Sequence, residues 1–151
     1  MRYHELLIST AASAGVNLII FPELSLTGYE PEMALRLALA DKTCLLPLQT
    51  LAERYDMTIV AGAPLQVTNR KPGIGACVIS SKQPVSFYRK MYLHPGESDY
   101  FLSGEAECVI TARTFNVGLA ICADAGHPMH AERTVQLKSF RRSAPCQKRT
   151  I

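Results

Sequence analysis

The hydrophobic pattern of the chain changes from helical spacing near the N-terminus to unbroken apolar runs further along. Tyr3, Leu6, Leu7 and Ala11 recur at roughly helical intervals, and Gly15 follows as a stop signal. The pattern predicts helices over residues 2–14, 31–40 and 47–55, and a fourth helix that starts after Asp124.

Aliphatic runs without polar alternation predict strands that are covered on both faces. The predicted strands lie at residues 16–21, 57–64, 73–80 and 84–90, with two more between residues 107 and 124. A polar turn at residues 81–83 joins two of these strands. Early helices followed by a mixed sheet indicate a layered α/β domain.

The composition is that of a single globular domain. The chain has 151 residues, of which 48% are hydrophobic and 19% are charged. No apolar run approaches the ~20 residues that cross a bilayer, and no signal peptide is evident, so we expect no membrane partner. Five cysteines, an odd number without close pairing, argue against a disulfide framework and for a cytoplasmic location.

The net charge of +3 is spread unevenly along the chain. Residues 1–132 carry 10 basic and 13 acidic side chains, whereas residues 133–151 carry 6 basic side chains and no acidic one. Basic segments can bind nucleic acids through their phosphates. Residues 138–151, however, have no helical apolar period and one aromatic residue, Phe140. We therefore expect a solvated tail there and no nucleic-acid partner.

Three predicted strands run directly into a side chain that can take part in chemistry. Glu23 follows "IIFP", Lys90 follows "VSFYR" and Cys122 follows "GLAI". Ligands and catalytic groups gather at the ends of sheet strands. If the three ends meet, a carboxylate can take the thiol proton, a thiolate can attack a carbonyl carbon, and an ammonium can stabilise the resulting oxyanion.

Each of these residues also has an ordinary structural interpretation. A cysteine after an aliphatic strand is often a small buried apolar residue, and Glu23 and Lys90 fit a loop and a solvated surface. His127 and His130 suggest a metal pair, but a single pair three residues apart is weak support for zinc. A cysteine hydrolase that pairs Cys122 with His94 or His127 is a further alternative, although it leaves Glu23 and Lys90 unexplained.

The segments around the three residues favour the catalytic interpretation. "FPELSLTGY", "YRKMYLHPGE" and "VGLAICAD" occur in this order and resemble the three active-site segments of the nitrilase superfamily, the carbon–nitrogen hydrolases. The resemblance implies that Glu23 is the general base, Lys90 supports the tetrahedral intermediate and Cys122 is the nucleophile. It also implies that Glu97 orients the lysine, and that neither a metal nor an organic cofactor is needed.

The resemblance further implies an amidase-type hydrolase that forms a thioester with a small-molecule amide or related substrate. The backbone N–H of Ala123 is expected to help bind the oxyanion, and Tyr29 and Tyr100 are candidates for lining the substrate site. Gly28 is expected to allow a sharp turn after the first segment. Asp124 is expected to cap the following helix.

The resemblance covers residues 1–137 and implies part of an α-β-β-α sandwich. The family's first strand and the second half of its sandwich are not recognisable, so we expect a chain truncated at both ends, with an open sheet edge. Residues 138–151 fit a disordered or frame-shifted tail. A homodimer, which the family forms, stays open. The alternative function is an inactive remnant or interaction module that keeps the motifs.

Overall fold

The computed structural model describes residues 2–68 and 70–140 of the chain. The helices are α1 (Arg2–Ser13), α2 (Ala34–Leu37), α3 (Leu46–Tyr55) and α4 (Pro128–Phe140). The strands are β1 (Leu18–Ile20), β2 (Thr58–Val67), β3 (Arg70–Ser80), β4 (Gln83–Arg89), β5 (Cys108–Ala112) and β6 (Phe115–Leu119). Short 3₁₀ turns lie at Pro31–Met33, Thr43–Leu45, Glu97–Asp99 and Cys122–Gly126.

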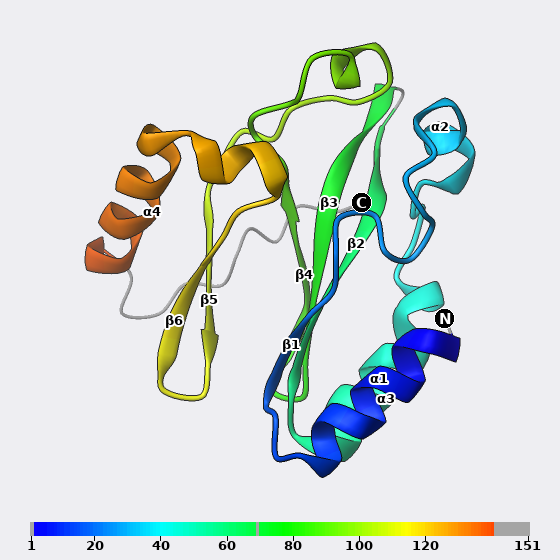
Figure 1. Cartoon of the computed structure of the whole chain (residues 1–151), viewed down its shortest axis with the longest axis vertical. Helices are drawn as coiled ribbons and strands as arrows, with labels where there is room; N and C mark the ends of the chain where they lie inside the picture. The colour runs from blue at the N-terminus through cyan, green and yellow to red at the C-terminus, as the bar shows by residue number, and fades with distance from the viewer. Residues whose placement is uncertain (1, 69, 141–151) are drawn as a thin grey trace.

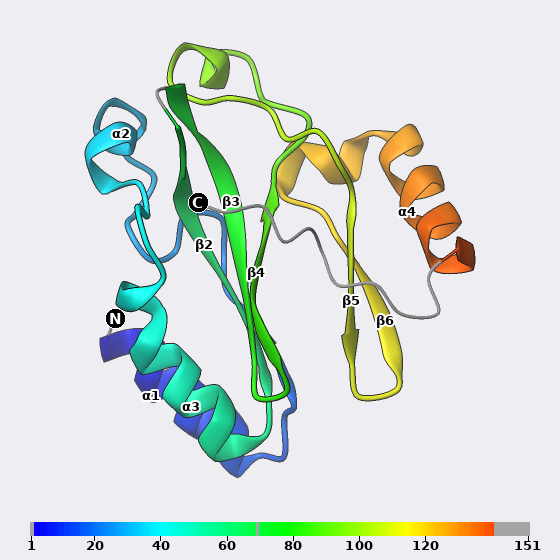
Figure 2. The ribbon, with the colours of Figure 1, turned by 180° about the vertical axis from the view of Figure 1, so that it is seen from behind.

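The strands form a mixed four-stranded sheet and a separate hairpin. The sheet has the order β1-β2-β3-β4, in which β1 pairs parallel to β2 and the remaining pairs are antiparallel. Helices α1 and α3 lie side by side on one face of the sheet, and the β5–β6 hairpin and α4 lie on the other side (Figure 1). The view from behind shows the same order of layers (Figure 2), which is α-β-β-α as predicted.

Two apolar cores share the central strands of the sheet, because successive side chains of a strand point to opposite faces. In β2, Ile59 and Ala61 belong to the core beneath α1 and α3, whereas Val60 belongs to the core beneath the hairpin. In β3, Cys77 and Val78 divide in the same way. Burial on both faces explains why these strands read as continuous apolar runs.

Some element boundaries differ from the prediction. The helix expected over residues 31–40 is a 3₁₀ turn followed by α2 and ends at Leu37, because Ala38 is extended and the Leu39 N–H donates to the Pro64 carbonyl. Helix α4, expected to start after Asp124, begins at Pro128 and continues to Phe140. Residues 141–151, most of the expected tail, lie outside the described residues.

Other sequence expectations concern the sheet edge, the membrane and the cysteines. Strand β1 lies at an edge of the sheet, where the Ile20 side chain is 57% exposed. No helix within residues 2–68 and 70–140 has the length and apolarity needed to span a membrane. Cys44, Cys77 and Cys122 are free thiols.

Candidate active site

Lys90 is held at the end of β4 as a buried cation between two carboxylates. Its backbone N–H donates to the Ile74 carbonyl at 2.8 Å, and its side chain is fully buried. The ammonium donates to Glu23 and to Glu97, with both N···O distances at 2.9 Å. An isolated buried ammonium would be strongly disfavoured, so the two carboxylates are what permit a charged lysine here.

The electrostatics of this group favour the charged forms of Lys90 and Glu97. Burial opposes the charge on Lys90, but the hydrogen bonds and charges of Glu23 and Glu97 outweigh it and raise the pKa of the lysine. Burial likewise opposes the charge on Glu97, but the His94 N–H (2.7 Å), the Lys90 ammonium and the Tyr29 hydroxyl (3.0 Å) together lower the pKa of that carboxyl. Lys90 therefore carries its positive charge at neutral pH.

Glu23 reaches the lysine because the loop after β1 lies directly on strand β2. A Cβ atom on Gly62 would lie 2.4 Å from the Leu24 nitrogen and 2.6 Å from the Pro22 carbonyl oxygen. The Leu26 N–H also donates to the Gly62 carbonyl at 2.9 Å. Only a residue without a side chain lets the two backbones approach this closely. Gly62 was not among the residues predicted to matter for the site. The only sequence feature that could have indicated this close approach is a lone glycine inside an apolar strand.

The sharp turn expected after the first motif is present. Gly28 has a φ of +84°, in the region that L side chains rarely adopt. The next residue, Tyr29, is about half exposed, and its hydroxyl donates to Glu97. The turn thus brings a tyrosine to the carboxylate that also binds Lys90.

Cys122 lies just after β6, on a short turn with unusual backbone geometry. Its side chain is exposed, and its φ of +47° is uncommon for any residue other than glycine. Strained backbone at a nucleophile tends to project its side chain away from the sheet end. The adjacent Ala123 is partly buried. Together, the two residues place a thiol and a backbone N–H on the same turn.

Asp124 joins the turn that carries Cys122 to the segment that follows Lys90. Its Oδ1 atom accepts the N–H groups of Met91 (3.0 Å) and Tyr92 (2.8 Å), and its Oδ2 atom accepts that of Ile121 (2.9 Å). The expected capping role is met in part: the bond from Ile121 caps the 3₁₀ turn Cys122–Gly126, whereas α4 begins only at Pro128, beyond the reach of Asp124 as its cap. The aspartate also connects two predicted catalytic segments.

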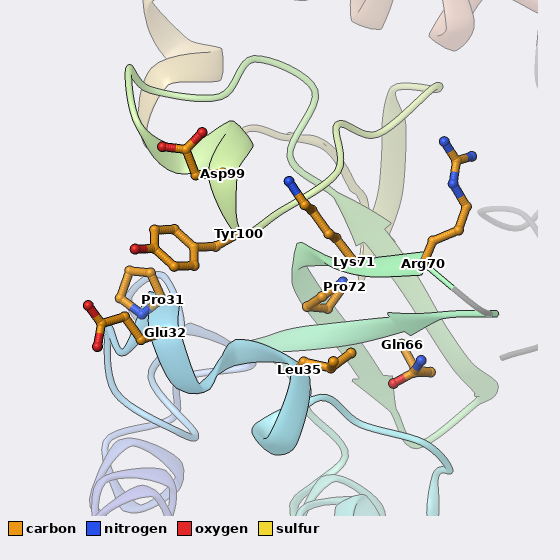
Figure 3. Close-up of a pocket in the computed structure, with 9 residues that line it drawn as sticks. All are labelled: Pro31, Glu32, Leu35, Gln66, Arg70, Lys71, Pro72, Asp99 and Tyr100. Atoms are coloured by element: carbon orange, nitrogen blue, oxygen red, sulfur yellow. The ribbon is translucent and has the colours of Figure 1, made fainter.

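The Tyr100 N–H donates to the carbonyl of Glu97 at 3.0 Å, while the Tyr100 side chain lines a pocket. The other residues that line the pocket are Pro31, Glu32, Leu35, Gln66, Arg70, Lys71, Pro72 and Asp99 (Figure 3). Glu23, Lys90 and Cys122 are not among them. The structure therefore brings Glu23, Lys90, Glu97 and Tyr29 together by hydrogen bonds, and it places the Tyr100 side chain at this pocket.

The histidines considered for a metal or a catalytic pair have other neighbours. The His127 ring stacks on Tyr92 with ring centroids 3.8 Å apart, and a ring nitrogen of His130 lies 2.9 Å from the Tyr88 hydroxyl. His94 is exposed, and its backbone N–H donates to Glu97. Within the described part of the chain, no group of three or more His, Cys, Asp or Glu side chains is arranged to hold a metal ion.

Comparison with known proteins gives one consistent relationship. The family model for carbon–nitrogen hydrolases matches residues 1–136. Glutamine-dependent NAD(+) synthetase of Aquifex aeolicus (strain VF5) is 29% identical over 128 residues, which cover 80% of this chain and 22% of that protein. The chain therefore spans about a fifth of the length of this curated relative.

Solved structures show the same fold. Saccharomyces cerevisiae Nit3, a member of branch 10 of the nitrilase superfamily, superposes with a TM-score of 0.77 at 20% identity, over 87% of this chain and 52% of its own. A variant of the amidase from Nesterenkonia sp. AN1 gives a TM-score of 0.71 at 23% identity, over 85% of this chain and 52% of its own. The chain thus spans about half of these structures, and it belongs to the carbon–nitrogen hydrolase family.

Proposed function

We propose that the chain carries the catalytic centre of an amidase-type hydrolase, which cleaves non-peptide carbon–nitrogen bonds of small molecules. Cys122 is the nucleophile, Glu23 the general base and Lys90 the group that stabilises the oxyanion. The observation that carries the proposal is the fully buried Lys90 ammonium, held at 2.9 Å by carboxylates from two other segments. A buried cation at the end of a strand is expensive, and charge stabilisation in a reaction accounts for it.

The first step forms a thioester. Glu23 takes the proton of the Cys122 thiol, and the thiolate attacks the carbonyl carbon of the amide. The carbonyl oxygen gains the negative charge, which the Lys90 ammonium and the Ala123 N–H stabilise. The carbon–nitrogen bond then breaks, and the nitrogen leaves as ammonia or an amine with the proton that Glu23 returns.

The second step releases the acid. Glu23 takes a proton from a water molecule, and the hydroxide attacks the thioester carbon. The carbon–sulfur bond breaks, the thiolate of Cys122 recovers its proton from Glu23, and the carboxylic acid leaves. The same carboxylate thus serves both steps, and the reaction consumes only the amide and water.

Glu97 has a supporting part in this scheme. It accepts three donors, namely the Lys90 ammonium, the His94 N–H and the Tyr29 hydroxyl, and its side chain is 5% exposed. A carboxylate fixed in this way holds the lysine in one orientation without being needed for proton transfer. Glu23, which is more exposed at 18%, remains the carboxylate accessible to substrate.

The printed names of the relatives guide the choice of substrates. The related proteins include a glutamine-dependent synthetase and an amidase, so we expect a primary amide, either glutamine or a short aliphatic amide, to be cleaved. The test is release of ammonia from such amides by the chain and by its Cys122→Ala and Glu23→Gln variants. We expect no release with Cys122→Ala, and a rate lower by roughly 10²–10⁴-fold with Glu23→Gln.

Two outcomes would contradict the proposal. Ammonia release by Cys122→Ala at the wild-type rate would exclude the thiol as nucleophile. A wild-type chain that releases no ammonia from the tested amides, and whose Cys122 forms no adduct with amide-like reagents, would favour the inactive remnant instead.

A further inference from the structure

Three buried side chains form a hydrogen-bonded series that connects helix α4 to the turn that carries Cys122. The Tyr88 hydroxyl lies 2.6 Å from Oδ2 of Asp124 and 2.9 Å from Nε2 of His130. The three residues come from α4, β4 and the 3₁₀ turn, and each is at most 3% exposed. None of them takes part in the reaction steps above.

The positions of the protons in this hydrogen-bonded series can be assigned from the donors available. A tyrosine hydroxyl has one proton, and an ionised carboxylate only accepts, so the Tyr88 proton points to Asp124. The Tyr88 oxygen must then accept from His130, which therefore carries a proton on Nε2. Burial and the neighbouring Asp124 raise the pKa of Tyr88 far above its ordinary value, which keeps the phenol protonated as this direction requires.

Asp124 is the residue through which this hydrogen-bonded series contacts the candidate active site. Its carboxylate accepts four donors: the Tyr88 hydroxyl and the backbone N–H groups of Ile121, Met91 and Tyr92. A fully buried carboxylate depends on each of its donors, because no water replaces one that is lost. Removal of the Tyr88 hydroxyl therefore loosens the carboxylate on which the turn and the segment after Lys90 both depend.

We propose that Tyr88 and His130 are positioning residues, which act through Asp124 to fix the Cys122 turn against the segment that follows Lys90. His130 orients the hydroxyl, Tyr88 orients the carboxylate, and the carboxylate holds the two backbones. The catalytic meaning of this arrangement rests on the proposed function. Its structural part, the tethering of the Ile121, Met91 and Tyr92 amides, can be measured independently.

The experiment uses three variants of the described chain and one matched control. Tyr88→Phe removes the hydroxyl and keeps the ring, His130→Leu removes the donor and keeps the bulk, and His130→Gln restores an N–H near the position of Nε2. His4→Leu is the control, because His4 is a buried histidine on α1 whose two ring nitrogens have no hydrogen-bond partner.

Two readouts are compared in all variants. Hydrogen exchange reports on the Ile121, Met91 and Tyr92 amides, with the β3 amides as an internal reference. Alkylation of Cys122 reports on the turn itself, while the buried Cys77 thiol reports any loss of the global fold. We expect exchange of the three amides to rise about tenfold in Tyr88→Phe and His130→Leu, to return toward wild type in His130→Gln, and to stay unchanged in His4→Leu.

The outcomes separate this proposal from the proposed function. The positioning role would be overturned if the three amides exchange at the wild-type rate in both Tyr88→Phe and His130→Leu. It would also be overturned if they exchange as fast in His130→Gln as in His130→Leu. If the exchange pattern follows expectation but wild-type Cys122 reacts no faster than Cys44, the tether stands and the hydrolase proposal fails. If Tyr88→Phe does not fold, Cys77 becomes reactive in that variant. The comparison of His130→Leu with His130→Gln then tests the positioning role alone.

Discussion

At the scale of single residues, the site depends on one lysine that pairs with two carboxylates. Lys90 is fully buried, Glu97 is almost so, and both distances are 2.9 Å. A buried ion pair adds little net stability over an apolar replacement of all partners, but the removal of one partner leaves the others without compensation. Lys90 is therefore a residue whose loss destabilises the fold and the chemistry together.

We predict that Lys90→Met lowers the free energy of unfolding by about 3–5 kcal/mol, because it strands Glu23 and Glu97 in a buried site. Denaturant unfolding monitored by circular dichroism measures the change. Lys82→Met is the matched control, since Lys82 pairs with Asp56 at the surface, where both side chains are mostly exposed. If Lys90→Met and Lys82→Met lose the same free energy of unfolding, the buried lysine has no special role in stability.

The lowered pKa of Glu97 predicts how stability depends on pH. A carboxyl whose pKa is lower in the folded state binds more protons when unfolded. Its contribution is thus complete above the ordinary value of 4.5 and is lost as the pH falls through the lowered pKa. The raised pKa of Lys90 acts at the other end, since its contribution is complete below 10.5 and is lost at higher pH.

Glu97→Gln tests this dependence. The variant should be less stable than wild type near pH 7, and the difference should shrink as the pH falls below about 4.5, where the wild-type carboxyl also becomes protonated. Urea unfolding at a series of pH values measures the difference. A stability gap that stays constant from pH 7 to pH 3 would show that the charge of Glu97 is not the cause.

At the scale of elements, the candidate site draws on the segments that follow β1, β4 and β6, which hydrogen bonds of Lys90 and Asp124 connect. Much of this was predictable, because buried strands read as apolar runs and Gly28 as a turn with positive φ. Contacts between segments distant in sequence were not predictable from local pattern. The link from Asp124 to Met91 and Tyr92, and the packing of the Glu23 loop on Gly62, depend on tertiary approach alone.

Other elements show where short-range reasoning fails. Asp124 was expected to cap a helix because aspartate favours that position; it caps only the 3₁₀ turn that starts at Cys122, and its other bonds, to Met91 and Tyr92, were not foreseen. Tyr88 precedes Lys90 by two residues, and alternate residues of a strand project to the same side. The sequence could therefore have indicated that Tyr88 lies on the same face as Lys90. The pocket that Tyr100 lines had no such signal, because its lining comes from loops and strand ends whose paths local sequence does not determine.

We predict that Gly62→Ala moves the Glu23 loop. The added methyl group would meet backbone atoms of Leu24 and Pro22 well inside contact distance, so the loop must shift, at a cost of about 1–3 kcal/mol. Cys122 should also react more slowly, because its base is displaced. Thermal unfolding and alkylation rates measure the two effects.

The control for this prediction is Gly126→Ala, in which the added Cβ has no atom within 4 Å. Its unfolding temperature should stay close to that of wild type. If Gly62→Ala unfolds at the same temperature and labels at the wild-type rate, the close approach of β2 to the loop does not position Glu23.

At the scale of the whole molecule, the two cores are coupled through one sheet. Side chains of β2 and β3 enter both cores alternately, so neither core can lose its packing while the other remains intact. The described layers cover about half of the solved structures that the chain resembles, yet they contain Glu23, Lys90, Glu97 and Cys122. These four candidate residues thus all lie within this part of the fold.

This coupling predicts a single unfolding transition. Burial raises the pKa of the Cys77 thiol to about 12, so it is unreactive in the folded protein at neutral pH. Loss of far-UV circular dichroism and exposure of Cys77 to a thiol reagent should follow the same denaturant curve. Exposure of Cys77 well before the loss of secondary structure would show that the core beneath α1 and α3 opens separately.

The central claim is that the fold activates Cys122 through Glu23 beside Lys90, and the most direct measurement is site-resolved alkylation. A haloacetamide alkylates thiolates and carries an amide group, which makes it a suitable reagent. Peptide mass spectrometry over time can follow Cys122 and the exposed Cys44 in the same molecule. We predict labelling of Cys122 at least about tenfold faster than that of Cys44, and loss of this advantage in Glu23→Gln. Equal rates at the two thiols, or an undiminished rate at Cys122 in Glu23→Gln, would contradict the account.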